Sequence, residues 1–192
     1  WVQAQPQKDG KNAGEMLTGA IKAAILLNTE PAFDAAAGAK GLEQADMVIT
    51  LSPFKANLDI SDVLLPVAPF TETSGTFVNA EGRVQSFHAV VKPLGETRPA
   101  WKVLRVLANL LELPGFDYES SQDVLTAAIG AETKEVPSAL RSNITKVAAK
   151  VPENEAAEPV TASIYQLDGI VRRATSLQLT ADARLAREGG AA

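Results

Sequence analysis

The chain contains no cysteine and one histidine, His88, among its 192 residues. Without cysteine it cannot form disulfides, a thiolate nucleophile, cysteine-ligated iron–sulfur clusters or the usual structural zinc sites. A single histidine also excludes metal sites built from several histidines. Any chemistry carried by these residues therefore has to use carboxylates, hydroxyls, amides or basic side chains.

Long apolar runs and an excess of positive charge are absent as well. The richest apolar stretch, residues 23–27, is far shorter than the roughly 18 residues that a membrane-spanning helix needs. The net charge is -5 and the basic residues are scattered, so we expect no nucleic-acid partner and no direct membrane insertion. The first residues have neither the features of a signal peptide nor an initiator Met, and we expect that the chain was cut from a longer protein.

The remaining composition is typical of a globular domain, with 46% hydrophobic and 21% charged residues. Short apolar runs at 21–27, 47–51 and 63–66 predict three strands. A short helix is expected from Asn12 to Leu17, stopped at Gly19, and a longer alanine-rich helix at 32–45. This alternation predicts an α/β fold with a partial, mostly parallel sheet flanked by helices. Because the strands are continuously apolar, we expect burial on both of their faces.

The later part of the chain predicts a β-hairpin followed by helices. β-prone runs at 76–78 and 83–85 flank a turn in which Gly82 would have a positive φ. A helix should begin near Pro99, with Trp101, Leu104, Leu107, Ala108 and Leu111 on one face, and end at 114–115. Further helices are expected at 124–129 and 138–149.

We divide the chain into five parts on these patterns. Residues 1–11 form a tail or loop, 12–150 the α/β domain, 151–160 an acidic, proline-bearing linker, 161–185 a helical C-terminal segment that docks onto the domain, and 186–192 a frayed tail.

The densest group of chemically able side chains lies at 71–83. It could line a polar ligand pocket, but we favour a turn-rich loop and hairpin whose side chains satisfy their own backbone. A triad of Ser74 with His88 and an acid has little support, since Ser74 is not in a Gly-x-Ser-x-Gly turn. The paired carboxylates of Glu72 and Glu81 have no better support. Phosphate-loop and dinucleotide glycine patterns are absent.

Two other polar features leave alternatives open. The expected carboxyl ends of the strands, at 28–30, 52–54 and 66–68, are polar enough for a ligand site but lack convergent charge. Arg172 and Arg173 could pair with acids on a partner surface, where arginine is enriched, or equally with solvent or acids of the same chain.

The runs Ser61–Pro66 and Thr71–Gln85 together resemble the hallmark of the molybdopterin-oxidoreductase superfamily, a strand ending in Leu-Pro followed by an acid, Gly-Thr and Asn-x-Glu-Gly-Arg. Ser61 stands where alanine is usual. Residues 26–31, 95–104 and 171–178 further resemble the large iron–sulfur subunit of bacterial NADH:quinone oxidoreductase, complex I.

This resemblance implies a structural and assembly role in the peripheral arm of complex I, on the cytoplasmic side of the bacterial inner membrane. The chain would support electron transfer from NADH to quinone without a redox centre or catalytic residue of its own. The iron–sulfur clusters would lie in the N-terminal part of the same subunit. That part and other peripheral-arm subunits would be its partners, and the isolated chain could self-associate.

The resemblance also implies a vestigial cofactor pocket, with these candidate residues: Glu72, Ser74, Gly75, Thr76, Asn79, Glu81 and Arg83. Two alternatives remain. The chain could be the cofactor-cradling C-terminal part of a molybdopterin-dependent oxidoreductase such as a formate dehydrogenase, or an autonomous small-molecule-binding α/β domain with a pocket at 71–83.

Overall fold

A computed structural model describes residues 11, 13–19, 21–35, 38–79, 83–129 and 163–189. The chain forms two compact units. The first contains residues 1–10, 51–55 and 65–149, and the second contains residues 11–50, 56–64 and 150–192. The described residues form a mixed α/β fold, as the sequence predicts.

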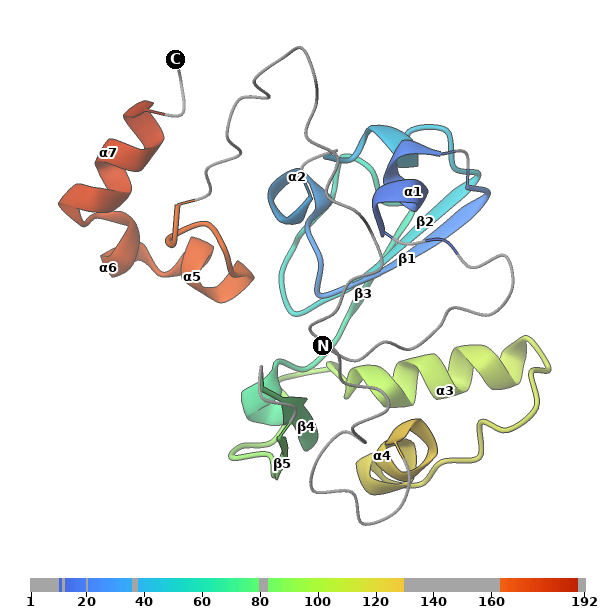
Figure 1. Cartoon of the computed structure of the whole chain (residues 1–192). Helices are drawn as coiled ribbons and strands as arrows, with labels where there is room; N and C mark the ends of the chain where they lie inside the picture. The colour runs from blue at the N-terminus through green and yellow to red at the C-terminus, as the bar shows by residue number, and fades with distance from the viewer. Residues whose placement is uncertain are drawn as a thin grey trace. The chain divides into compact units, whose positions relative to one another are not determined.

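Three parallel strands form a small sheet in the order β1-β2-β3, with β2 at its centre (Figure 1). These are β1 (Ala23–Leu27), β2 (Met47–Ser52) and β3 (Val63–Pro66). All three strands were expected from the short apolar runs. Strands β2 and β3 each begin in the second unit and end in the first.

The expected burial on both faces is confirmed for β2 but is wrong for its neighbours. Thr50 and Leu51 of β2 are 0% and 1% exposed. By contrast, Ile25 of β1 is 48% exposed and Val63 of β3 is 38% exposed. The reason is position, since β1 and β3 are the edges of a three-stranded sheet.

The core of the second unit joins α1 (Ala13–Thr18) to the start of β2. Leu17 of α1, Leu42 of the 3-10 turn η1 (Lys40–Leu42) and Val48 of β2 form one buried cluster. Helix α1 agrees with the predicted short helix before Gly19. Gly41 is required for this packing, because a Cβ there would overlap the backbone carbonyl of Leu17.

The predicted helix at 32–45 is wrong. Helix α2 (Pro31–Asp34) is four residues long and ends where Ala35 becomes extended, with φ -136° and ψ 134°. Gly38 then takes a left-handed φ of 61°. The helix propensity of the alanines in 32–45 is outweighed by Gly38, which adopts a conformation that breaks a helix.

Three short helices form the C-terminal segment, defined as residues 163–189. They are α5 (Gly169–Arg173), α6 (Thr175–Gln178) and α7 (Ala181–Gly189). Gln178 is 7% exposed, and its side-chain amide donates to the carbonyls of Tyr165 and Val171, each at 2.9 Å. The segment is therefore organised around a buried polar contact of its own.

The first unit contains the predicted hairpin, formed by β4 (Gly75–Val78) and β5 (Val84–Phe87). The strands are antiparallel, and their pairing runs from Gly75 opposite Phe87 to Val78 opposite Val84. Asn79 and Arg83 close the turn, because the Arg83 amide donates to the Asn79 Oδ1 at 2.9 Å. Gly82 and its predicted φ lie outside the described residues.

Helix α3 (Ala100–Leu110) begins directly after Pro99, as predicted. Ala108 is buried and the other members of its predicted apolar face are partly buried, except Leu111, which follows the helix and is 60% exposed. Helix α4 (Ser121–Ile129) includes the predicted helix 124–129 and starts three residues earlier. The predicted helix 138–149 and linker 151–160 lie outside the described residues, and the five-part division of the chain stays a prediction.

Candidate functional site

The residues predicted for a vestigial pocket lie on the loop and hairpin of the first unit. Glu72 ends the 3-10 turn η2 (Phe70–Glu72), Gly75 and Thr76 open β4, and Ser74 lies between them. Asn79 and Arg83 flank the hairpin turn. Glu81 lies outside the described residues.

The polar side chains of this loop are engaged with the backbone of residues 89–94 or with the opposite strand. The Leu94 amide donates to the Glu72 Oε2 at 2.9 Å, and the Ala89 amide donates to the Ser74 Oγ at 3.4 Å. The hydroxyls of Thr76 and Ser86 hydrogen-bond across the hairpin at 3.0 Å. These contacts favour the turn-rich interpretation of 71–83. The Ser74 hydroxyl is directed to a backbone amide, which gives no support to a triad with His88.

The apolar side of the hairpin also leaves no room for a ligand at Gly75. A Cβ on Gly75 would lie 2.9 Å from the ring of Phe87, so the space beside this glycine is filled by an aromatic side chain. The Phe77 ring stacks on Phe87 at 4.9 Å and meets Phe70 edge-on at 6.2 Å. In the described part of the chain, the buried side-chain nitrogens without a hydrogen-bond partner belong to Arg105 and Arg172. The described residues of this loop thus pack against one another, and the vestigial cofactor pocket stays a prediction.

A second polar network follows β1 in the second unit. Asn28 takes a left-handed φ of 51° directly after the strand, a conformation that asparagine tolerates better than most residues. The side-chain amide of Asn57 donates to the Thr29 carbonyl at 2.8 Å and to the Thr50 hydroxyl at 3.3 Å. Thr50 in turn hydrogen-bonds Ser61 at 2.7 Å. The chain after β1 is thus fixed to β2 and to the loop that precedes β3.

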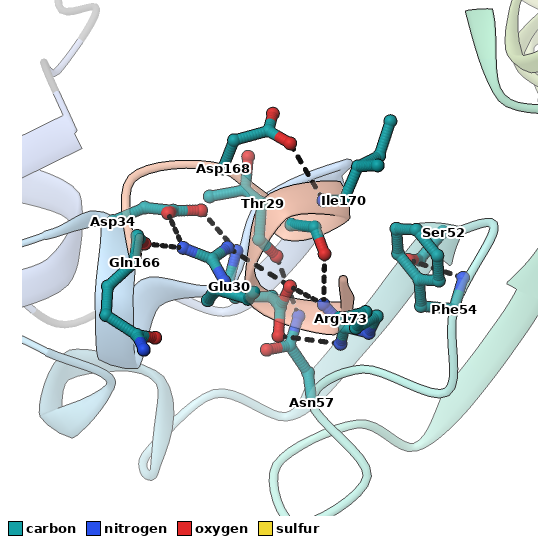
Figure 2. A network of polar contacts seen from close by, with 12 residues as sticks. Thr29, Glu30, Asp34, Ser52, Phe54, Asn57, Gln166, Asp168, Ile170 and Arg173 are labelled. Atoms are coloured by element: carbon teal, nitrogen blue, oxygen red, sulfur yellow. Dashed lines mark hydrogen bonds and ion pairs between the residues drawn. The ribbon is translucent and has the colours of Figure 1, made fainter. Parts of the chain in front are cut away.

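Four charged residues, which we call the ion cluster, converge at this point. Arg172 Nη2 lies 3.1 Å from Glu30 Oε1, and Arg172 Nη1 lies 3.0 Å from Asp34 Oδ1. Arg173 binds the same Glu30 through both of its terminal nitrogens, at 2.8 and 3.0 Å. Figure 2 shows Glu30 and Arg173 directed toward one another, with Asn57 and Thr29 beside them and Asp34 in the same network.

Arg172 and Glu30 are the shielded members of the ion cluster, whereas the side chains of Asp34 and Arg173 are 26% and 33% exposed. The side chain of Arg172 is 7% exposed, and that of Glu30 is 12% exposed. The guanidinium of Arg172 also lies 4.9 Å from the centre of the Phe33 ring, a favourable cation–π geometry. The hydrogen bond from Arg173 is the largest influence on Glu30 and lowers its pKa, and it outweighs the opposing effect of burial. Burial alone would lower the pKa of Arg172, but hydrogen bonds to Asp34 and Glu30 reverse this effect and raise it.

The sequence predicts that residues 28–30, at the end of β1, are polar, but it does not predict that Arg172 and Arg173 bind there. Arg172 and Glu30 are 142 positions apart, and no local pattern links two side chains over that distance. The intramolecular alternative for Arg172 and Arg173 is confirmed, because both bind acids of the same chain. Two features of the sequence could have suggested the cluster. Arg172 and Arg173 are adjacent in α5, and Glu30 and Asp34 lie at the two ends of α2.

The residues that the structure describes form neither a metal site nor a membrane span. No group of three or more histidine, cysteine, aspartate or glutamate side chains is placed among them to hold a metal ion. Within the same part of the chain, no helix combines the length and apolar character needed to cross a membrane.

Residues 2–110 match the family model described as "Molybdopterin oxidoreductase". The chain belongs to the molybdopterin oxidoreductase family. This match contains the segments Ser61–Pro66 and Thr71–Gln85, which first indicated the superfamily, and it ends before the C-terminal segment.

Individual curated proteins align with this chain over shorter stretches than the family model does. The chain is 39% identical over 77 residues to "Putative formate dehydrogenase SAB2186c" of Staphylococcus aureus (strain bovine RF122 / ET3-1), a stretch that covers 40% of this chain and 8% of the relative. It is 40% identical over 70 residues to "Probable oxidoreductase YjgC" of Bacillus subtilis (strain 168), covering 36% of this chain and 7% of the relative. The aligned part of the chain thus spans less than a tenth of the length of these relatives. Their names match the predicted alternative better than the complex I branch, which stays a prediction.

Proposed function

We propose that this chain is one segment of a molybdopterin-type oxidoreductase that resembles a formate dehydrogenase, and that its own role is structural. The observation that carries this proposal is the family match over residues 2–110, together with relatives named as formate dehydrogenase and oxidoreductase. No redox step is assigned to the residues of this chain.

The geometry of the loop and hairpin supports the structural role. The Glu72 carboxylate and the Ser74 hydroxyl accept backbone hydrogen bonds from Leu94 and Ala89, residues that lie 22 and 15 positions later. Hydrogen bonds from a side chain to a backbone amide far along the chain help to hold the two segments together. In this proposal, Glu72 and Ser74 serve to attach residues 89–94 to the loop that precedes β4.

The second candidate is the large iron–sulfur subunit of complex I, which rests on the resemblance of residues 26–31, 95–104 and 171–178 to that subunit. The segments 26–31 and 171–178, which carry that resemblance, are distant in sequence but are joined by the pairing of Glu30 with Arg172 and Arg173. Residues 171–178 lie beyond the family match. The family match therefore does not test this resemblance.

Metal and cofactor analysis of the complete protein that contains this chain tests the two candidates. We expect bound molybdenum or tungsten, an extractable pterin and formate-dependent reduction of an artificial electron acceptor. A protein without metal or pterin that co-purifies with NADH:quinone oxidoreductase activity would contradict the proposal and support the complex I subunit.

The structural role of the loop has its own test in the complete protein. We expect Glu72→Gln and Ser74→Ala to reduce thermal stability, by about 1 kcal/mol for each backbone hydrogen bond weakened, and to leave the pterin content per folded molecule unchanged. Thr73→Ala, in the same loop, is the matched control, because the Thr73 hydroxyl donates to the carbonyl of the adjacent Ser74 and so links no distant segment. Loss of pterin from a variant with unchanged stability would show that the loop binds cofactor.

A further inference from the structure

The C-terminal segment is attached to the second unit through charge. Arg172 and Arg173 of α5 reach Glu30, at the N-terminus of α2, and Asp34, at its last residue. Asp168 caps α5 by accepting from the amides of Ile170 and Val171, at 2.8 and 3.2 Å, so the helix that presents both arginines has a fixed start.

Apolar burial contributes little to this attachment. Large apolar side chains of the segment remain mostly in solvent, with Ile164 69%, Leu167 61%, Leu179 58% and Leu185 65% exposed. At about 25 cal/mol per Å² of buried apolar surface, side chains left this exposed provide only a small part of their possible stabilisation. The attachment therefore depends on the ion cluster to an unusual degree.

The ion cluster is partly buried, and ion pairs of this kind give a well-defined geometry without a large net free energy. Removing charges from water costs several kcal/mol for each ion, and their mutual attraction roughly offsets that cost. The cluster has two positive and two negative side chains, so its members can neutralise one another only when the segment is docked. Docking of this kind is specific in its geometry and weak in its net strength, which are the properties of a reversible contact.

The docking position is the carboxyl end of β1. In open parallel sheets, ligands bind outside the carboxyl ends of the strands. Here Glu30 lies three residues after the end of β1 at Leu27, and Arg172 and Arg173 contact the Glu30 carboxylate. The segment therefore lies at an edge of the sheet that parallel folds commonly leave open.

We propose that the C-terminal segment is a releasable cover over the carboxyl end of β1, and that the ion cluster is its latch. In the docked state the carboxylates of Glu30 and Asp34 are neutralised by the two arginines. In the released state the same acidic pair is open to solvent. This inference does not depend on which oxidoreductase the complete protein proves to be.

Hydrogen–deuterium exchange on the complete protein tests the latch. We expect Glu30→Gln to speed exchange of the amides of α5 and α6 about tenfold at low salt, while amides of α3 keep their wild-type rates. The matched control is Glu96→Gln, which removes an acid from a pair with Arg98 in which the Glu96 side chain is 93% exposed. Unchanged exchange in α5 and α6 of the Glu30 variant would overturn the proposal.

Salt gives a second measurement that needs no variant. Raising the ionic strength of the wild-type protein from about 0.1 M to about 1 M shortens the Debye length from about 10 Å to about 3 Å and favours separated charges. We expect exchange in α5 and α6 to rise several-fold while α3 does not respond. If α3 and α5 lose protection together, the segment unfolds with the rest of the protein and is not a releasable cover. If neither responds, the ion cluster is not a latch.

Discussion

At the scale of single residues, the ionisation of Glu30 has the clearest consequence. Its pKa is held below the ordinary value of 4.5, first by the hydrogen bond from Arg173. A carboxyl group whose pKa is lower in the folded state stabilises the fold at pH values above its unfolded pKa. That contribution disappears as the pH falls through the folded pKa.

We therefore expect the free energy of unfolding to fall below about pH 4.5, more steeply in the wild-type protein than in Glu30→Gln, where position 30 has no proton to gain. Chemical denaturation across a pH series measures the difference between the two proteins. The Glu96→Gln variant should follow the wild-type curve. Parallel curves for wild type and Glu30→Gln would contradict a role for Glu30 ionisation.

Gly41 permits a second prediction at this scale. Because a Cβ at this position would overlap the Leu17 backbone, Gly41→Ala must separate η1 from α1. We expect a loss of about 1–3 kcal/mol, as for other overpacked core positions. Thermal or denaturant unfolding measures it, with Lys40→Ala, an exposed change in the same turn, as the control. A change below about 0.5 kcal/mol, the range of ordinary surface substitutions, would show that the contact relaxes without cost.

Local residue patterns predicted the hairpin turn at Asn79 and the turn-rich loop that precedes it, because the residues that form a turn are neighbours in the sequence. The partners of Glu72 and Ser74 could not be predicted in the same way. Leu94 and Ala89 offer backbone amides, which carry no side-chain signature. The ion cluster was hidden by its long separation in sequence.

At the scale of elements, the start of α4 illustrates a signal that the sequence contains and periodicity misses. The Ser120 Oγ accepts a hydrogen bond from the Asp123 amide at 3.1 Å, and the Asp123 carboxylate accepts from the amides of Glu119 and Ser120. The backbone hydrogen bond from Glu119 is the largest cause of the lowered pKa of Asp123. This reciprocal cap explains why α4 starts at Ser121, before the apolar residues begin.

We expect Ser120→Ala to destabilise the first unit by about 1 kcal/mol, the usual effect of removing an N-cap hydroxyl. Equilibrium unfolding should show this loss, whereas Ser121→Ala, one residue inside the helix, should change stability little. Equal effects of the two substitutions would show that the cap does not determine where α4 begins.

The strands, the hairpin and α3 follow the predicted pattern because each has a strong local signal. The strands have compact apolar runs, the hairpin has turn residues between β-prone runs, and α3 has proline before an apolar face of helical spacing. The prediction of a helix at 32–45 fails because two glycines, Gly38 and Gly41, offset the helix propensity of the alanines. Its observed structure is instead decided by packing around Leu17 and Leu42.

At the scale of the whole molecule, exposed apolar side chains are the dominant feature of the first unit. Val90 is 82%, Leu94 77% and Leu110 76% exposed. Extensive exposed apolar surface is typical of regions that contact another protein or another part of the same protein. The named relatives are more than ten times longer than the stretches that align with this chain.

We accordingly expect the isolated chain to self-associate, and we expect Leu94→Glu and Leu110→Glu to shift it toward monomer. Sedimentation velocity at several concentrations measures this shift. Lys92→Gln is the control, since it changes the net charge by the same single unit without removing an apolar side chain. A monomer at all concentrations would contradict the prediction.

The separation of Glu30 from Arg172 has an evolutionary consequence. The acid lies inside the stretch shared with the family, residues 2–110, and the two bases lie outside it. A homologue that has lost its last three helices would retain Glu30 without its counter-ions and open to solvent, so no contact would maintain an acid at this position. Acidic character at position 30 and arginine at 172 and 173 should therefore be gained and lost together across related genomes.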